Sequence, residues 1–308
     1  MRIDRSRLAA RLGAPPLTRF APAPTGRLHL GHVVNAIYVW GLAAATGGRV
    51  LLRVEDHDRQ RCRPAYEAAL LDDLDWLGFA PDVFPTAAFR AGPCEGRQSD
   101  RDARYRAAAA ALASRGLVYG CACTRRDIEA AGGAGGVDEL RYPGTCRDRG
   151  LPLDAGLGWR LRLPDEVVAF DDVVHGPGRQ TPAEQCGDLL LRDRLGNWTY
   201  QFAVTVDDLA QGVTLVIRGD DLYASTGRQI LLARLLGRDV PPVFLHHPLV
   251  MKSPTQKLSK ADGDRGVRDL AAAGWTPARV IGQAAHAAGL LDAPGEMPLA
   301  DLPSLVTA

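Results

Sequence analysis

The sequence predicts an α/β protein with a parallel sheet. Segments with strand and helix character alternate over the first 80 residues, which is the order that builds parallel sheets. The run "RVLLRVED" (49–56) is short and mainly apolar, as expected for a strand buried on both faces. A chain of 308 residues, 46% hydrophobic, can bury a full core. We therefore expect one large domain with an insertion or two.

The elements of the first half follow in order. "LTRFAPAP" (17–24) has the pattern of a short strand that ends in a proline-rich turn. "LGHVVNAIYVWGLAAATGG" (30–48) has the pattern of a helix closed by a glycine pair. After the strand at 49–56, "PAYEAALLDDLDWLGF" (64–79) begins with proline and has apolar residues at helical spacing. This segment should be the crossover helix.

The second half repeats the theme less regularly. Residues 188–221 hold three apolar runs separated by turn residues. "TGRQILLARLLG" (226–237) predicts a helix and "PVFLHHPLV" (242–250) a strand, and the chain after Lys260 is Ala-rich and predicted to be helical. The glycine-rich "AAGGAGGVDEL" (130–140) predicts a flexible loop.

Composition excludes several classes of protein. No stretch approaches the roughly 20 apolar residues of a membrane span, and the first residues lack the apolar core of a secretory signal. Six cysteines in so long a chain do not form the dense pattern of a secreted disulfide scaffold, so we expect a cytoplasmic protein. The formal net charge of +1 excludes a strongly basic nucleic-acid protein but leaves room for a local basic face.

Two segments have features of phosphate binding. "RFAPAPTGRLHLGH" (19–32) ends a strand and opens a helix, whose first N–H groups attract phosphate. On these residues alone, a metal-binding histidine pair or an ordinary helix start is equally compatible. "KLSK" (257–260) puts two lysines in a loop that could reach a polyphosphate. When this segment is considered alone, a solvated basic loop is the commoner interpretation.

In combination, the two segments resemble the two signature sequences of class I aminoacyl-tRNA synthetases. Three further segments resemble the glutamate branch of that family and occur in the same order: "LLRVEDHDRQR" (51–61), "WTYQFAVTVDD" (198–208) and "GVTLVIRGDDL" (212–222). The resemblance covers most of residues 18–262. It implies a Rossmann-like catalytic domain in which ATP lies across the carboxyl ends of the parallel strands.

The resemblance also implies a set of site residues. Glutamate carries two carboxylates and one ammonium, so its site needs fixed cations and at least one acid. The implied glutamate contacts are Arg19, Phe20, Ala21, Pro22, Ala23, Glu55, Tyr200 and Arg218. Either arginine can bind a carboxylate in bidentate fashion, Glu55 suits the ammonium, and Tyr200 offers a hydroxyl and an apolar wall.

Activation by such an enzyme is an attack of the glutamate α-carboxylate on the α-phosphate of ATP. The resemblance assigns the catalytic roles on the phosphates to His29, His32, Lys257 and Lys260, and ATP binding to Gly31, His32 and Lys260. Mg²⁺ would accompany ATP, held mainly by phosphate oxygens and water. No protein nucleophile is required.

Only residues 261–308 follow the second signature, too few for the separate anticodon-binding domain of an ordinary glutamate enzyme. We therefore expect that domain to be absent. The shortened form resembles members of the branch that esterify glutamate onto the queuosine base of tRNA(Asp). The expected partners are L-glutamate, ATP and queuosine-containing tRNA(Asp), with no membrane and a monomeric chain. The alternatives are a truncated enzyme that charges the 3′ end of tRNA(Glu) and a small-molecule adenylating ligase.

The cysteines of "YGCACT" (119–124) and "RYPGTCR" (141–147) are not spaced as a C-x-x-C redox pair, and a cytosolic disulfide is improbable. The branch carries an inserted domain with two cysteines, a tyrosine and a third cysteine, which implies one structural Zn²⁺. Here the ligands would be Cys121, Cys123, Tyr142 and Cys146. Water, Asp127 or Asp148 could replace Tyr142, and three free structural cysteines are the alternative to a metal site.

We expect two halves of the catalytic domain at 1–114 and 156–250, the zinc-bearing insertion at 115–155, and the KLSK loop with a helical segment at 251–308. No functional role is assigned to the remaining cysteines and histidines, namely Cys62, Cys94, Cys186, His57, His175, His246, His247 and His286.

Overall fold

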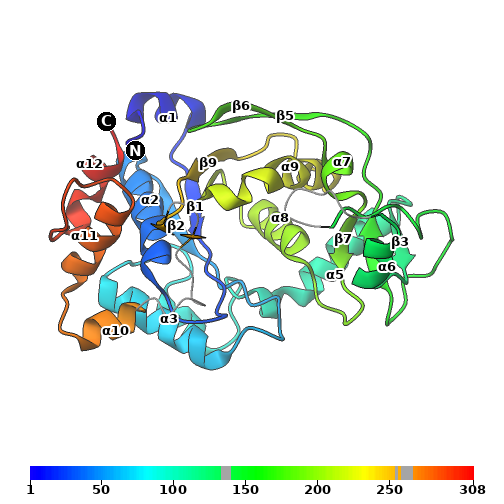
Figure 1. The fold of residues 1–308 in the computed structure, drawn as a ribbon, viewed down its shortest axis with the longest axis horizontal. Helices are drawn as coiled ribbons and strands as arrows, with labels where there is room; N and C mark the ends of the chain where they lie inside the picture. Colours follow the sequence, from blue (N-terminus) through cyan, green and yellow to red (C-terminus); the bar gives the residue numbers. More distant parts are fainter. Residues whose placement is uncertain (133–139, 254–255, 258–265) are drawn as a thin grey trace.

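The computed structural model describes residues 1–132, 140–253, 256–257 and 266–308. Figure 1 shows the elements in chain order. The α-helices are α1 (Arg5–Leu12), α2 (Leu30–Thr46), α3 (Pro64–Leu77), α4 (Thr86–Ala91), α5 (Asp102–Ala113), α6 (Arg125–Ala130), α7 (Pro182–Cys186), α8 (Tyr200–Ala210), α9 (Thr226–Leu235), α10 (Val267–Ala272), α11 (Pro277–Ala287) and α12 (Leu302–Val306).

The strands are β1 (Leu17–Phe20), β2 (Arg49–Leu52), β3 (Val118–Cys121), β4 (Gly158–Leu161), β5 (Val168–Asp172), β6 (Gly176–Gln180), β7 (Leu189–Arg192), β8 (Leu215–Gly219), β9 (Val243–His247), β10 (Met251–Ser253) and β11 (Gln256–Lys257). The described residues also form the short 3₁₀ turns η1 (Gln98–Arg101), η2 (Asp220–Ser225) and η4 (Leu299–Asp301). In the described part of the chain, no helix combines the length and apolar character needed to cross a membrane.

The centre of the protein is a parallel sheet. β1 pairs in parallel with β2, and β8 pairs in parallel with β9. The two pairs lie side by side, because the Thr214 N–H donates to the Leu17 carbonyl over 2.9 Å. A parallel bridge from Leu51 to Val83 extends the sheet beyond β2. The order from Val83 through β2, β1 and β8 to β9 is that of a Rossmann-like sheet, so the predicted α/β class is confirmed.

The helices predicted at 30–48 and 64–79 are also confirmed, and their ends have local causes. α2 begins at the N-cap His29 and ends at Gly47, whose φ of 67° is a left-handed conformation that glycine adopts without strain. α3 has proline in its first turn and ends at Gly78 with φ 81°. Sequence therefore locates both helices closely.

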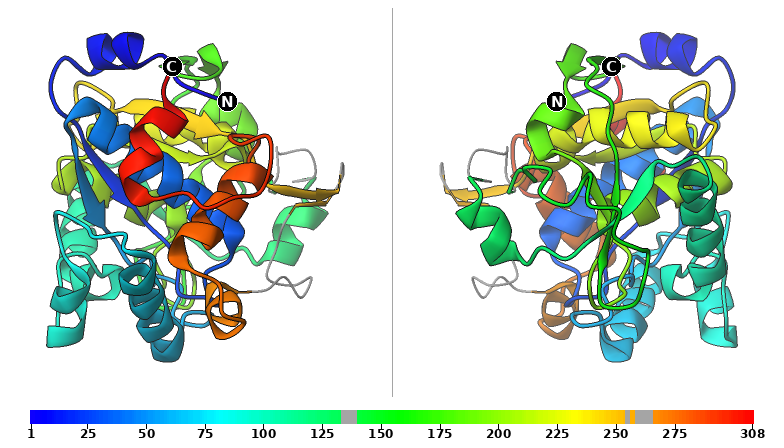
Figure 2. Two further views of the ribbon diagram at one scale, coloured as in Figure 1. Left: turned by 90° about the vertical axis from the view of Figure 1, so that its left-hand side faces the viewer. Right: turned by 90° about the vertical axis from the view of Figure 1, so that its right-hand side faces the viewer.

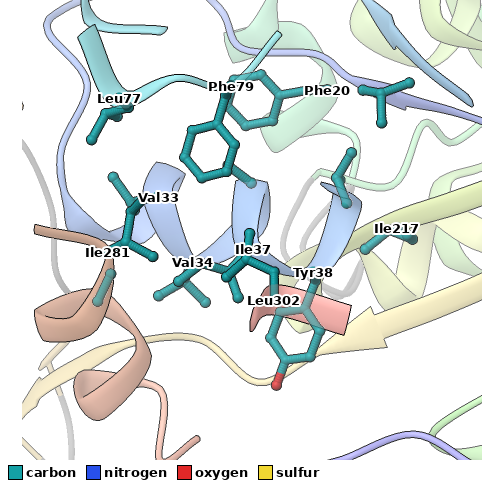
Figure 3. Packing of buried hydrophobic residues seen from close by; sticks show 14 of the residues in the cluster. Phe20, Val33, Val34, Ile37, Tyr38, Leu77, Phe79, Ile217, Ile281 and Leu302 are labelled. Carbon is teal, nitrogen blue, oxygen red and sulfur yellow. The ribbon is translucent and has the colours of Figure 1, made fainter. Parts of the chain in front are cut away.

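α2 is the centre of the main core. Val33, Val34 and Ile37 are almost completely buried, between strand residues such as Ile217 and helix residues such as Ile281 (Figure 3). Figure 2 shows α11 and α12, in orange and red, packed against α2. The chain after residue 266 thus completes the core of the first half of the protein.

A second, smaller sheet carries Cys121, the first cysteine of the predicted metal site. β3, β4 and β7 form an antiparallel sheet in that order. It lies at the far end of the molecule from α10–α12 (Figure 1). The strands β4 and β7 follow residue 155, so the sheet includes more chain than 115–155. The insertion bounds remain a prediction, and most of the glycine-rich loop lies outside the described residues.

A buried ion cluster joins the two halves of the parallel sheet. The fully buried guanidinium of Arg53, directly after β2, donates to Asp208 on α8 over 2.7 Å and to Glu55 over 3.1 Å. Asp207 lies 3.9 Å from the same guanidinium. Burial lowers the pKa of Arg53, but the three carboxylates raise it overall. Arg53 is therefore a permanent cation that links β2 to α8.

We predict that Arg53→Met destabilises the protein by about 3–5 kcal/mol, because it leaves buried carboxylates without their partner. Chemical denaturation measures the free energy of unfolding. Arg106→Met is the control: Arg106 is 63% exposed and forms only an i,i+4 pair with Asp102, so we expect a change of about 0.5 kcal/mol or less. Equal losses in the two variants would contradict a central role for Arg53.

Candidate active site and metal centre

Three charged residues meet at the carboxyl edge of the parallel sheet. Arg19 lies on β1, Glu55 follows β2, and Arg218 lies on β8. Parallel strands end at the same edge, which is where open α/β sheets bind their ligands. All three side chains are buried, with exposed fractions of 4–6%. The sequence predicted that these residues share a site, and the fold brings their strands together.

Two of the three guanidinium nitrogens of Arg19 form hydrogen bonds within the protein. Its Nε donates to Asp208 over 3.2 Å and its Nη1 to the Ile217 carbonyl over 3.0 Å. Its Nη2 has no partner among the described residues and keeps contact with solvent. The anchored atoms fix the plane of the group, so Nη2 presents fixed donors to an anion in the cleft.

Glu55 is arranged in the complementary way. Its Oε1 accepts two hydrogen bonds from Arg53, at 3.1 and 3.3 Å. Its Oε2 has no partner in the described part of the chain and also keeps contact with solvent. The site thus offers a fixed donor from Arg19 and a fixed acceptor from Glu55. That combination suits an amino acid, which carries both an anion and a cation.

Arg218 is oriented by a histidine that the sequence left without a role. Its Nε donates to His246 Nε2 over 2.9 Å, and His246 Nδ1 lies 2.7 Å from Asp172. Because an arginine only donates, Nε2 is the acceptor and the proton of His246 is on Nδ1. Burial lowers the pKa of His246, although the bond to Asp172 opposes it. His246 is therefore neutral and holds Arg218 in place.

Tyr200, the first residue of α8, forms a wall of the site. Burial, followed by the charge of Glu55, raises the pKa of its hydroxyl, and the charge of Arg218 opposes this. The segment 20–23 contributes mainly backbone: Glu55 N–H donates to the Pro22 carbonyl over 3.1 Å. The Phe20 side chain points into the core against Trp40, at 5.3 Å between ring centroids. Any ligand contact of Phe20 would therefore be through its main chain.

The first signature forms the start of α2. The Gly31 N–H donates to His29 Nδ1 over 3.1 Å, and the His29 N–H donates to His32 Nδ1 over 3.2 Å. Both Nδ1 atoms are acceptors, so in the neutral rings the protons are on Nε2. The rings lie 4.1 Å apart between centroids. This tautomer turns each histidine into a donor, as a phosphate ligand requires.

The second signature is described only in part. The backbone of Lys257 lies in β11, whereas Lys260 lies outside the described residues. The chain that follows returns to the first signature: His29 and Gly266 form a β-bridge, and the Val267 N–H donates to the Leu28 carbonyl over 2.9 Å. The chain that follows the second signature thus returns to the first signature at Gly266.

Cys121, Cys123 and Cys146 come together at the second sheet. Their sulfur atoms all lie within 4.8 Å of one another, with 3.6 Å between Cys123 and Cys146. In a tetrahedral zinc site with Zn–S bonds of about 2.3 Å, neighbouring sulfurs are roughly 3.8 Å apart. The spacing of the thiols therefore fits a zinc ion. Burial raises the pKa of Cys146, but hydrogen bonds from the Ala122 backbone and neighbouring groups lower it to about 7.

The Tyr142 hydroxyl lies beside the three thiols. It is 3.4 Å from Cys121 Sγ and accepts from the Cys146 N–H over 2.7 Å. The carboxylates considered as alternatives have other partners. Asp127 caps α6 through Thr124, and Asp148, with a side chain 88% exposed, pairs with Arg162. The described geometry thus favours Tyr142 over either carboxylate as a fourth ligand.

Two arginines surround the thiols with positive charge. Arg160 Nε donates to Cys121 Sγ over 3.4 Å while its guanidinium stacks on the Tyr142 ring at 3.7 Å. Arg149 Nη1 donates to Cys146 Sγ over 3.6 Å. Three thiolates around Zn²⁺ carry one net negative charge, and these outer cations would stabilise it.

A cavity of about 650 Å³ opens beside the amino-acid site. Its inner wall includes Pro24 of the first signature and Asp56, the neighbour of Glu55. Its lining includes the apolar side chains of Leu71 and Phe89 and several arginines, among them Arg59 and Arg63. Arg63 is exposed, and its side chain has no ion-pair partner in the part of the chain that the structure describes.

Comparison with known proteins agrees with this geometry. Residues 17–282 match the family described as tRNA synthetases class I (E and Q), catalytic domain. The Glutamyl-Q tRNA(Asp) synthetase of Rhodobacter capsulatus is 43% identical over 86% of this chain and 99% of its own length. The protein of the same name from Nitratidesulfovibrio vulgaris is 41% identical over 89% of this chain and 86% of its own. The chain belongs to the glutamyl-Q tRNA(Asp) synthetase family of class I tRNA synthetases.

Solved structures agree with this family. A glutamate tRNA ligase from Elizabethkingia meningosepticum, crystallised with its amino acid, matches with a TM-score of 0.73 and 28% identity over 88% of this chain. The glutamate–tRNA synthetase of Elizabethkingia anophelis matches with a TM-score of 0.72 and 28% identity. The chain spans only 60–61% of the length of these two proteins. The likeness therefore extends to the catalytic part of class I enzymes.

Several residues that shape the site were not predicted. Arg53 and Asp208 lie in motifs of the sequence, but no role was predicted for them or for His246. Arg53 had a usable signal: a charged residue within an apolar run must find a buried partner. Asp172, the partner of His246, lies 74 residues away in sequence, and no local pattern predicts such a pairing.

We predict about one zinc ion per chain in the purified protein, and its loss in Cys121→Ser and Cys146→Ser, because three thiolates anchor the ion. Metal analysis by mass spectrometry measures the stoichiometry. Cys62→Ser is the control and should retain the ion, since Cys62 is outside the cluster. A metal-free wild-type protein prepared without chelators would refute the zinc site.

Proposed function

We propose that this chain activates L-glutamate with ATP and transfers it to the queuosine base of tRNA(Asp). The observation that carries the proposal is the arrangement of Arg19 and Glu55. Some polar atoms of each side chain are held by neighbouring residues, and others face the cleft. The chain also belongs to this synthetase family. Arg218 and Tyr200 complete the amino-acid site. A small-molecule adenylating ligase is disfavoured, because the family match covers residues 17–282.

Glutamate would bind with its charges matched to these groups. Its ammonium meets Glu55 Oε2, and its carboxylates meet the open N–H groups of Arg19 and Arg218. The α-carboxylate then attacks the α-phosphorus of ATP, an anhydride bond forms, and pyrophosphate leaves. The protein supplies position and charge for this step, and no covalent intermediate with a side chain is needed.

The ATP phosphates would lie at the start of α2. Gly31 has no side chain to block their approach, and His29 and His32 donate through Nε2. Mg²⁺, when bound with ATP, neutralises phosphate charge and would be held mostly by phosphate oxygens. Lys257 and Lys260 are proposed from the sequence motif to add positive charge on the same side. The bridge between His29 and Gly266 supports this placement.

The RNA would approach through the cavity beside the amino-acid site. A base taken from a single-stranded loop needs an apolar surface for its face and cations for the neighbouring phosphates. The lining of the cavity includes the apolar residues Leu71 and Phe89 and the exposed Arg63, which supports this proposal. The zinc-binding segment is proposed to have a structural role at the other sheet, because its thiols are buried or half-buried.

Charging of the 3′ end of tRNA(Glu) is the second candidate. It is favoured by the likeness to two solved glutamate–tRNA ligases. Both functions share the same activation step, so only the acceptor separates them. The higher identity to the glutamyl-Q relatives, 41–46%, favours the queuosine base.

We predict that labelled glutamate is transferred to tRNA(Asp) that contains queuosine and not to tRNA(Asp) that lacks it. The reason is that an ester requires the hydroxyl of the modified base. Acid-precipitable label measures the transfer, and tRNA(Glu) is included in parallel. Labelling of tRNA(Glu) alone would support the second candidate and reject the first.

We also predict that Arg63→Glu weakens binding of tRNA(Asp) about tenfold or more at low salt while pyrophosphate exchange is unchanged. The charge reversal repels phosphates at the rim but lies outside the amino-acid site. Filter binding at several salt concentrations measures it. Arg5→Glu is the matched control, because Arg5 is exposed on α1 at the other end of the molecule from α3 (Figure 1). Equal weakening by both changes would argue against the cavity as the RNA entrance.

A further inference from the structure

We propose that His57 is the proton acceptor of the transfer step. The inference rests on the proposed function and adds a catalytic residue to it. His57 belongs to the segment "VEDHDR" (54–59), two residues after Glu55. Its ring is half-buried and lies 6.2 Å from the ring of Tyr200, between centroids.

A chain of hydrogen bonds fixes the imidazole. His57 Nδ1 lies 2.7 Å from Gln98 Oε1, and Gln98 Nε2 donates to Asp207 over 2.8 Å. Asp207 is fully buried and is itself held by Arg101 over 2.7 Å and by the Tyr105 hydroxyl over 2.9 Å. Gln98 and Asp207 each have partners on both sides, so the group that holds His57 Nδ1 is fixed in place.

The same bonds fix the tautomer. A carboxylate only accepts, so the group of Gln98 that faces Asp207 must be its NH₂ and the group that faces His57 must be its carbonyl oxygen. A carbonyl oxygen also only accepts, so Nδ1 of His57 carries a proton. In the neutral ring, Nε2 is then unprotonated, and its lone pair can accept a proton. The relay therefore prepares a base, as the third member of a catalytic triad prepares its histidine.

His57 lies at the junction of the two proposed binding sites. On one side, Tyr200 and Glu55 belong to the amino-acid site. On the other side, the sequence neighbours of the relay, Asp56 and Ser99, line the cavity proposed for the RNA. An RNA hydroxyl that enters from the cavity and a glutamyl group held by Arg19 and Arg218 would meet at this wall.

The transfer of the glutamyl group to the RNA requires one general base. The RNA hydroxyl oxygen attacks the carbonyl carbon of glutamyl-adenylate, and a new ester bond forms. The anhydride C–O bond breaks, and AMP leaves with that electron pair. The hydroxyl proton passes to His57 Nε2 and from there to solvent. General bases of this kind typically accelerate such a step by about 10²–10⁴-fold.

The neighbouring carboxylates are poorly suited to this role. Oε1 of Glu55 is bound by Arg53, and its other oxygen is reserved for the ammonium of glutamate. Asp56 accepts from the Ser99 N–H and from Arg59, at 2.7 and 3.0 Å. Asp58 is bound by Arg61; burial raises its pKa, but these hydrogen bonds lower it overall, which makes it a weak base.

The test separates the two half-reactions in the full chain. Pyrophosphate exchange reports activation, and a single-turnover assay reports transfer from preformed glutamyl-adenylate to queuosine-containing tRNA(Asp). For His57→Ala we expect transfer to fall about 100-fold with exchange within about twofold of wild type. Added imidazole should restore transfer and leave exchange unchanged. Gln98→Leu, which removes the partner of Nδ1, should lower transfer less than His57→Ala and with the same selectivity.

The outcomes are distinct. His286→Gln on α11 is the control and should change neither half-reaction, because His286 lies away from the site. Transfer by His57→Ala within about threefold of wild type overturns the inference and leaves the proposed function standing. Equal losses in exchange and transfer, without rescue by imidazole, show a structural role and also overturn it. Absence of transfer by the wild-type enzyme rejects the proposed function and the inference with it.

Discussion

The buried guanidinium of Arg53 is the interaction on which the site depends. It lies directly after β2 and bonds Glu55 on its own strand and Asp208 on α8, and Asp208 in turn bonds Arg19 on β1. Burial raises the pKa of Asp208, but the charges of Arg53 and Arg19 lower it overall, so the carboxylate stays ionised. Three elements that are distant in sequence are joined by charges that cannot be separated without large cost. The same bonds fix the groups that face the ligand.

Each functional side chain follows one design: part of its polar group is anchored and part is open. Arg19 is anchored by Nε and Nη1, Glu55 by Oε1 and His57 by Nδ1. Arg218 is anchored through His246. Such groups need no reorganisation when the ligand arrives, which is how electrostatic preorganisation lowers a barrier. The anchors make the site rigid before any substrate is bound.

Sequence alone predicted the fold class and the helices at 30–48 and 64–79, because these features depend on local periodicity and capping residues. The charged residues at the strand ends came from the resemblance to class I synthetases, which is carried by the motifs. The sequence did not predict the anchors, because each pairs residues far apart in the chain: Arg53 with Asp208, and His246 with Asp172. It also left His57 without a role. The tautomer of His57 depends on how Gln98 is oriented by Asp207, and no sequence pattern contains that information.

Local pairing also limits the positive charge around the cavity. Around the cavity, Arg59 is paired with Asp56, Arg90 with Asp72 and Arg97 with Glu67. Only charges that lack an internal partner contribute strongly to the field that phosphates meet. Among the described residues, Arg63 is the arginine of this lining that has no such partner, so the proposed attraction of RNA phosphates to the cavity depends mainly on Arg63. An unstacked base, which the proposed function places here, can enter such a cavity where a duplex cannot.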